Sequence, residues 1–152
     1  SAPPLYAEAS SISGAVDRWQ LITWEAPANV YFDIGCARAG SGAPDGDRSQ
    51  GISMWSTHLV TPETDTSTHY FFSFTRDFKL DDADVTQILS DGSRTAFNED
   101  LVVVEAQQRA ITTSKNAPRI DIKIDNGPLQ ARRVLAKLVE AERQERRKPA
   151  AE

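Results

Sequence analysis

A long stretch of the chain without a helix-breaking residue runs from position 93 to 117, where neither Gly nor Pro occurs. Gly and Pro interrupt regular structure most strongly, so this stretch favours one long helix, which we predict over residues 94–113 despite its three consecutive valines. On that helix the face of Asp100 also carries Val103, Val104 and Gln107. If the valines face the core, Asp100 does too, and a buried carboxylate needs a cation, a metal or strong donors. Alternatively, Asp100 belongs to an acidic first turn that complements the helix dipole.

Two predicted hairpins precede this helix. Residues 18–24 and 29–36 are rich in β-branched and aromatic side chains and flank the turn Ala26-Pro27-Ala28, so they predict a first hairpin. Residues 52–60 and 67–76 predict a second hairpin around the turn at 61–66. The four Gly and one Pro of residues 39–51 predict a long loop between the hairpins, of a kind that is often functional.

Aromatic side chains recur along the predicted strands. Strict alternation places Tyr70, Phe72 and Phe74 on one face, which we predict to be the core face. Four other aromatic residues could line an aromatic pocket, although aromatics in strands are core by default: Trp24, Tyr31, Trp55 and Phe71. Cys36, also on a predicted strand, is expected to be a small buried hydrophobic residue.

The two histidines of the chain fall in the second predicted hairpin. If its turn is centred between Glu63 and Thr64, His58 lies directly opposite His69 and both point the same way. The pair could then ligate a metal, and Asp100 would complete the two-His, one-carboxylate set of non-haem iron oxygenases. A His on a sheet face is more often a hydrogen-bonded pocket or core residue, and the sequence does not show that the three residues converge.

The remaining segments predict shorter elements. Residues 80–89 predict a short helix that stops at Asp91-Gly92, and the alternating residues 120–125 predict a last strand. Residues 129–146 predict an amphipathic helix whose buried stripe holds Ala131, Val134, Leu135 and Leu138, with basic residues around it that form a solvated face or dock a subunit. Residues 1–16 predict an irregular arm and residues 149–152 a frayed tail.

These elements together predict an α+β fold. An antiparallel sheet would wrap over the long helix and leave a pocket between them, with a C-terminal amphipathic helix. The length of 152 residues fits one domain, which we place at residues 17–148.

Composition narrows the classes of function. The net charge of −5 argues against nucleic-acid binding, and the apolar runs are too short to span a membrane. A single Cys excludes internal disulfides and fits a reducing cytoplasm. The first residues do not form a signal peptide, and an initial Ser suggests a processed or truncated chain. The glycine motifs of nucleotide-binding proteins and of α/β-hydrolases do not occur.

A set of short motifs resembles one family. In order, they are Asp17-Arg18-Trp19, Trp24-Glu25-Ala26-Pro27-Ala28-Asn29, Gly40-Ser41-Gly42, Gly46-Asp47-Arg48-Ser49-Gln50-Gly51, Thr61-Pro62-Glu63-Thr64, His69-Tyr70-Phe71-Phe72, Arg76-Asp77-Phe78, Glu99-Asp100, Val103-Val104-Glu105-Ala106-Gln107-Gln108, Asp125-Asn126-Gly127 and Ala131-Arg132-Arg133. Together they resemble the C-terminal catalytic portion of Rieske-type ring-hydroxylating oxygenases, in the branch of vanillate O-demethylase, toluenesulfonate monooxygenase and dicamba monooxygenase. The resemblance covers nearly the whole chain from Asp17.

The resemblance implies a helix-grip fold, as in START and Bet v 1 proteins, and a monooxygenase that acts on an aromatic acid or aryl ether with O₂. It implies that Asp100 is the carboxylate ligand of a mononuclear Fe(II), and that His58 contacts substrate and does not bind iron. A [2Fe-2S] Rieske cluster on an N-terminal domain would pass electrons from NADH, delivered by a reductase component. It further implies a cytoplasmic homotrimer.

The sequence departs from the family pattern in its metal ligands. It has neither the Cys-and-His motifs of the Rieske cluster nor the His-x4-His pair that supplies the other two iron ligands. The resemblance places both upstream of Ser1, so whether this chain alone is an enzyme stays open. Two alternatives are a stand-alone helix-grip module that binds a ligand without metal, with Asp100 as a polar anchor, and a structural half-domain that pairs with a partner chain.

Overall fold

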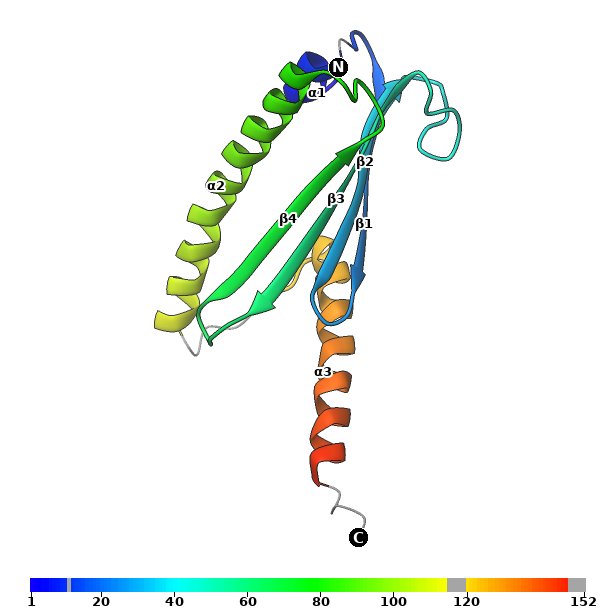
Figure 1. Ribbon diagram of the computed structural model, residues 1–152. Coiled ribbons are helices and arrows are strands. Elements are labelled where there is room, and N and C mark those ends of the chain that lie inside the picture. The colour runs from blue at the N-terminus through cyan, green and yellow to red at the C-terminus, as the bar shows by residue number, and fades with distance from the viewer. Residues whose placement is uncertain (11, 115–119, 148–152) are drawn as a thin grey trace.

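The computed structural model describes residues 1–10, 12–114 and 120–147 (Figure 1). In chain order, its elements are α1 (Pro4–Ser10), β1 (Val16–Glu25), β2 (Asn29–Arg38), β3 (Gly51–Pro62), β4 (Thr68–Arg76), α2 (Ala83–Thr113), the 3₁₀ turn η1 (Lys123–Asp125) and α3 (Asn126–Arg147). None of the helices in these ranges is long and apolar enough to cross a membrane.

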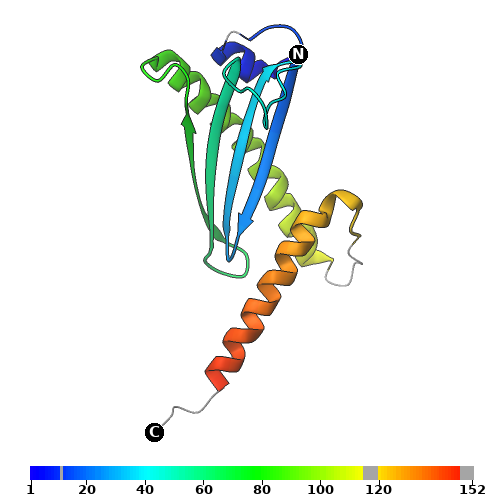
Figure 2. The same cartoon turned by 90° about the vertical axis from the view of Figure 1, so that its right-hand side faces the viewer.

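The four strands form one antiparallel sheet in the order β1-β2-β3-β4. Both predicted hairpins are present, because β1 pairs with β2 and β3 with β4, and residues 39–50 form the predicted loop between them. The helix α2 lies along one face of the sheet, which we call the inner face (Figure 2). The α+β prediction is therefore confirmed.

The core forms where α1, the sheet and the first turns of α2 meet. Its buried members are Tyr6, Ala9, Cys36, Ile52, Met54, Val85 and Leu89. The prediction of an irregular arm was wrong for residues 4–10, because Tyr6 and Ala9 lie one helical turn apart and bury their side chains against the sheet and α2. The prediction that Cys36 is buried is confirmed.

The long helix is longer than predicted. It begins at Ala83, where the Asp82 carboxylate caps it by accepting a hydrogen bond from the Val85 N–H, and it runs through the predicted stop at Asp91-Gly92. A Cβ at Gly92 would lie 2.7 Å from Leu5 Cδ1 of α1. Gly92 is therefore a contact point between two helices, and the packing of α1 offsets the helix propensity that glycine lacks.

The prediction of a strand at residues 120–125 was wrong. Residues 123–125 form η1, whose Asp125 carboxylate accepts a hydrogen bond from the Ile122 N–H at 2.9 Å, and α3 follows from Asn126. This local bond gives the backbone an alternative to a strand ladder. The predicted buried stripe of the last helix was also wrong, since no residue of α3 is buried and the helix projects away from the sheet (Figure 1).

Candidate functional site

His58 lies on the inner face of β3, but it does not face His69. In the observed register His58 pairs with Phe72, whereas His69 pairs with Thr61. The turn is held by hydrogen bonds from Glu63 N and Thr64 N to Ser67 O, so its centre lies further along the chain than predicted. Since side chains alternate between faces, this shift turns His69 to the outer face, and the predicted cross-strand histidine pair was wrong.

The His58 ring has a polar partner at each nitrogen. Its Nε2 lies 2.5 Å from Ser56 Oγ, and its Nδ1 is hydrogen-bonded to the Tyr70 hydroxyl. Ser56 is on the same strand, two residues away and therefore on the same face, while Tyr70 comes from β4. The sheet register thus holds the imidazole between two hydroxyl groups.

Aromatic rings surround His58 and its hydroxyl partners. The His58 ring centre lies 4.6 Å from that of Phe32 and 5.6 Å from that of Phe97, which reaches in from α2. Phe97 also lies 4.5 Å from Phe72 and 6.1 Å from Phe74. His58 is only 8% exposed, and this burial lowers its pKa, so the ring is neutral at pH 7.

Asp100 lies on α2 one turn beyond Phe97 and is exposed. Phe97 contacts rings of the sheet, and Asp100, three residues further along, lies on the same side of α2. Burial and, to a lesser extent, the charge of Asp100 raise the pKa of Tyr70. Val103 and Val104 are 67% and 59% exposed, so the condition for a buried carboxylate is not met. The alternative of a first-turn charge was wrong too, because Asp100 lies in the middle of α2.

A cavity of about 280 Å³ lies between β4 and the first half of α2. Its apolar lining comes from Met54, Phe72, Phe74 and Leu89, and Arg94 of α2 adds a cation. Phe72 and Phe74 also contact Phe97, so the cavity adjoins the cluster around His58. The predicted pocket between sheet and helix is confirmed, and its size suits a small organic molecule.

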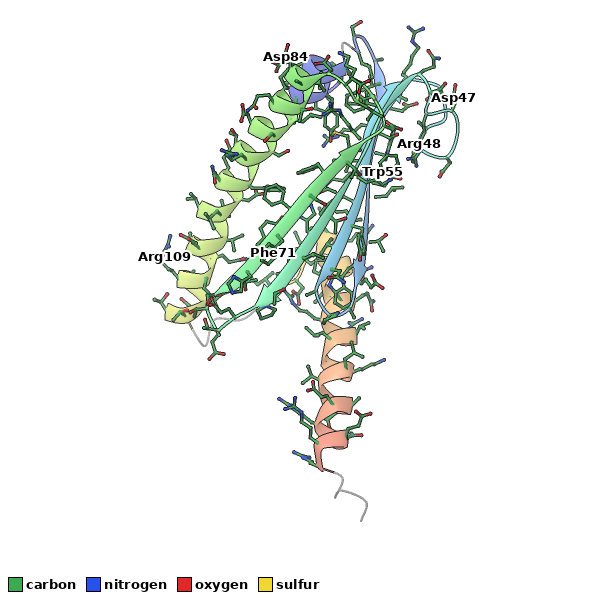
Figure 3. The ribbon with its side chains drawn as sticks, viewed as in Figure 1. Asp47, Arg48, Trp55, Phe71, Asp84 and Arg109 are labelled. Carbon is green, nitrogen blue, oxygen red and sulfur yellow. The ribbon has the colours of Figure 1, made fainter. Side chains whose placement is uncertain are left out.

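Most of the aromatic pocket candidates from the sequence lie elsewhere. Strand alternation puts Tyr31, Trp55 and Phe71 on the outer face, where they are 37%, 42% and 60% exposed, and Figure 3 shows Trp55 and Phe71. Sequence reasoning missed Phe97 and Tyr70 as site residues. Tyr70 could have been found from the strand alternation only with the correct register.

The described residues do not bring together a complete metal site. No three His, Cys, Asp or Glu side chains among residues 1–10, 12–114 and 120–147 cluster to hold an ion. Both nitrogens of His58 are engaged, and Asp100 stands apart from His69 on the other face. A mononuclear iron would therefore find at most one ligand, Asp100, in the described part of the chain.

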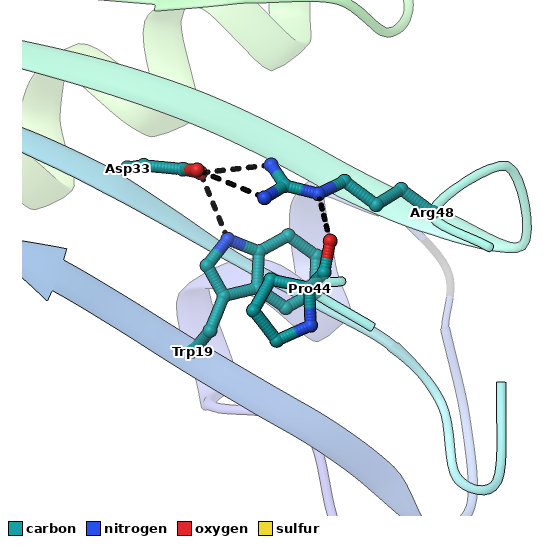
Figure 4. A network of polar contacts seen from close by, with 4 residues as sticks. All are labelled: Trp19, Asp33, Pro44 and Arg48. Atoms are coloured by element: carbon teal, nitrogen blue, oxygen red, sulfur yellow. Dashed lines mark hydrogen bonds and ion pairs between the residues drawn. The ribbon is translucent and has the colours of Figure 1, made fainter. Parts of the chain in front are cut away.

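The loop between the hairpins is anchored on the outer face. The Arg48 guanidinium donates two hydrogen bonds of 3.0 Å to the Asp33 carboxylate and one of 2.7 Å to Pro44 O, and the Trp19 indole donates to Asp33 at 2.9 Å (Figure 4). Burial alone would raise the pKa of Asp33, but the bonds from Arg48 and Trp19 and the charge of Arg48 lower it overall. These contacts fix the loop on the sheet, away from the cavity.

The chain is similar in sequence to a known protein family and to components of known oxygenases. Residues 1–141 match the family model described as vanillate O-demethylase oxygenase C-terminal domain. The chain is 37% identical over 147 residues to a vanillate O-demethylase oxygenase subunit of a Pseudomonas species, covering 93% of this chain and 45% of that protein. It is 36% identical over 139 residues to the iron-sulfur subunit of a toluene-4-sulfonate monooxygenase system of Comamonas testosteroni, covering 91% and 40%.

A solved structure matches as well. Apo dicamba monooxygenase superposes with a TM-score of 0.73 at 30% identity, over 88% of this chain and 42% of that one. The same enzyme bound to dicamba gives a TM-score of 0.71 at 31% identity, over 85% of this chain and 38% of that one. The chain thus spans less than half the length of the relatives it matches.

Proposed function

The chain belongs to the family of vanillate O-demethylase oxygenase C-terminal domains, and from this premise we propose that it forms the substrate-facing wall of an aromatic monooxygenase and supplies one iron ligand. The predicted resemblance to Rieske-type oxygenases is confirmed by the family model and the relatives, and the helix-grip-like fold by the match to dicamba monooxygenase.

One observation carries the proposal. The inner face of the sheet presents His58 and Tyr70, α2 presents Asp100, and the Phe97 ring of α2 contacts the rings of both His58 and Tyr70. Polar groups within an aromatic cluster suit an aromatic molecule that carries an oxygen substituent. The relatives are named for vanillate and toluene-4-sulfonate, which are such molecules.

The residues of this chain would bind and orient the substrate. The rings of Phe32, Phe72, Phe74 and Phe97 would pack against an aromatic acid or aryl ether and exclude water from it. The polar group formed by His58 and its hydroxyl partners would donate a hydrogen bond to a substrate oxygen, and so select one orientation of the ring.

Asp100 would serve as a carboxylate ligand of a mononuclear Fe(II), which when bound supplies the chemistry that activates O₂. One carboxylate cannot hold Fe(II) against water at neutral pH. The other iron ligands, and the [2Fe-2S] cluster implied by relatives named as iron-sulfur subunits, would come from outside the matched region. A reductase component would supply electrons from NADH, and the assembly would be a cytoplasmic homotrimer.

The proposal is tested by substrate-dependent O₂ uptake in the oxygenase that contains this chain, with its reductase and NADH. Asp100→Asn keeps the side-chain volume but removes the charge, and we expect turnover near zero. Uptake that is unchanged in Asp100→Asn would contradict the proposal.

The cavity also supports a second candidate, a module that binds an aromatic ligand without metal. Such a module would bind vanillate with the same affinity in the presence and absence of iron, and would show no O₂ uptake under any of these conditions.

A further inference from the structure

The His58 ring has no nitrogen left for a substrate. A neutral imidazole offers one N–H and one lone pair in the ring plane, and both nitrogens already have partners, Ser56 Oγ and the Tyr70 hydroxyl. A substrate oxygen could reach a ring nitrogen only by displacing one of these hydroxyls. The arrangement therefore does not suit His58 as the direct contact.

Tyr70 differs from His58 in both capacity and access. A phenol has one O–H to donate and can also accept, so its bond to His58 uses only part of its capacity. Tyr70 is 45% exposed whereas His58 is 8% exposed, so the tyrosine lies nearer to the open space beside α2. Its ring centre is 5.9 Å from that of Phe97 and 5.9 Å from that of Phe72, which fixes the ring among the aromatic side chains of the site.

We propose that the Tyr70 hydroxyl makes the hydrogen bond to the polar oxygen of the aromatic substrate, and that His58 is a positioning residue that orients this hydroxyl. The inference rests on the proposed function and deepens it. Ser56 O–H donates to His58 Nε2, His58 Nδ1–H donates to the Tyr70 oxygen, and the Tyr70 O–H is left to donate into the site. Each hydroxyl and ring nitrogen then has one role in a continuous chain, and each bond in such a chain polarises the next.

This chain of donors selects a class of substrate. It ends in a donor, so it recognises an acceptor oxygen, such as that of a sulfonate, carboxylate or ether, attached to a ring that packs on Phe72 and Phe97. The neutral state of His58 supports this arrangement, because a protonated ring would donate from both nitrogens and turn the Ser56 hydroxyl away.

The test measures dissociation constants in the oxygenase that contains this chain, with toluene-4-sulfonate as the probe and toluene as the probe without acceptor oxygens. Tyr70→Phe keeps the ring contacts and removes the hydroxyl. We expect it to weaken toluene-4-sulfonate binding about tenfold or more, since a bond to a charged oxygen is lost, and to leave toluene binding and iron content unchanged. The matched control is Tyr31→Phe, which removes a hydroxyl bonded to Glu25 on the outer face and should change neither constant.

Variants of His58 separate direct contact from positioning. His58→Ala should weaken toluene-4-sulfonate binding, and combining it with Tyr70→Phe should add little, because both changes remove the same bond. His58→Asn offers an amide N–H near the Nδ1 position and should restore much of the affinity. If Tyr70→Phe leaves the constant unchanged while His58→Ala raises it, His58 is the direct contact and the inference is overturned. If the unmodified oxygenase binds neither probe and no other aromatic molecule, the proposed function fails and the inference fails with it.

Discussion

The two ends of the space between the sheet and α2 are built differently. At the end next to α1, which we call the closed end, Tyr6, Ile52 and Leu89 are buried against one another. At the other end, the open end, Leu101, Val103 and Ile111 of α2 are 53% to 67% exposed. Figure 3 places Asp84 at the closed end of α2 and Arg109 at its open end.

Along α2, the end that contributes most to stability differs from the end that carries the candidate site residues. The closed end holds most of the buried apolar side chains and therefore contributes most of the hydrophobic stabilisation. His58, Tyr70, Phe97 and Asp100 lie beyond it, and of these Tyr70 and Asp100 are exposed whereas His58 is buried. Ligand sites need such access, and the packed end supplies the rigidity that holds them in register.

The largest loss of stability on substitution is expected in the core of the closed end. Ile52→Ala removes a side chain that is 3% exposed and should lower the free energy of unfolding by about 2–5 kcal/mol, through lost burial and a cavity. Val103→Ala, at the open end, should change it by less than about 0.5 kcal/mol. Urea unfolding of both variants measures the contrast, and equal losses would show that the two ends do not differ.

A smaller effect is expected on the outer surface of the closed end. Arg48→Ala breaks the paired bonds to Asp33 and should cost about 1–2 kcal/mol, reduced by the partial exposure of both side chains. Because the pKa of Asp33 is lowered, its contribution is present above the ordinary value of about 4 and is lost as the pH falls through the lower folded value. Acid titration of unfolding should show this loss in the unmodified chain only, and an identical curve for Arg48→Ala would refute the assignment.

His58 predicts a pH effect at the boundary between the two ends. Its pKa is lowered by burial, so between the ordinary value of about 6.5 and the lower folded value the unfolded chain binds more protons. Stability should therefore fall as the pH drops through that window and should not depend on His58 above it. In His58→Gln the urea midpoint should no longer change with pH in that window, whereas in His69→Gln it should change as in the unmodified chain. A midpoint of His58→Gln that still changes with pH would show that His58 is not the source of the effect.

The smallest effect concerns the contact between α1 and α2. Gly92→Ala gains up to about 1 kcal/mol of helix propensity, but the new Cβ would meet the flexible end of Leu5, so the net change should stay within about 1 kcal/mol. In a Leu5→Ala background the helix gain should appear in full. Thermal unfolding of the double variant checks this, and a stabilisation of the same size in both backgrounds would mean that Gly92 does not serve α1.

The hairpins of the fold could be predicted from the sequence, but the register between their strands could not. Strand-forming runs and the turns between them are local features, so the two hairpins were predicted correctly, and the burial of Cys36 followed from its apolar character. The register was not predicted correctly, because it depends on the side-chain and backbone bonds of the turn around Thr64 and Ser67, and a shift of an odd number of residues exchanges the two faces. The predicted helix stop at Gly92 was wrong because α1 packs against α2 there. The predicted strand at residues 120–125 was wrong because a local hydrogen bond to the Asp125 carboxylate favours a turn.

The site was less predictable than the fold. Helix spacing and hairpin geometry singled out Asp100 and His58, family resemblance gave them their roles, and those roles stay proposals. Spacing alone placed Asp100 with a buried valine face that the structure does not have. The prediction that Tyr70 belongs to the core was wrong, because Tyr70 is 45% exposed, and its partnership with His58 depends on the cross-strand register.

The central claim is that α2 presents Asp100 to an iron centre at the open end. The most direct measurement is iron per active site in the oxygenase that contains this chain, compared between Asp100→Ala and Glu99→Ala. Neighbouring helical residues point about 100° apart, so Glu99 is a matched carboxylate on a different face of α2. The account predicts near-complete loss of iron and of substrate-dependent O₂ uptake in Asp100→Ala, and retention of most of both in Glu99→Ala. Normal iron content and turnover in Asp100→Ala would contradict it.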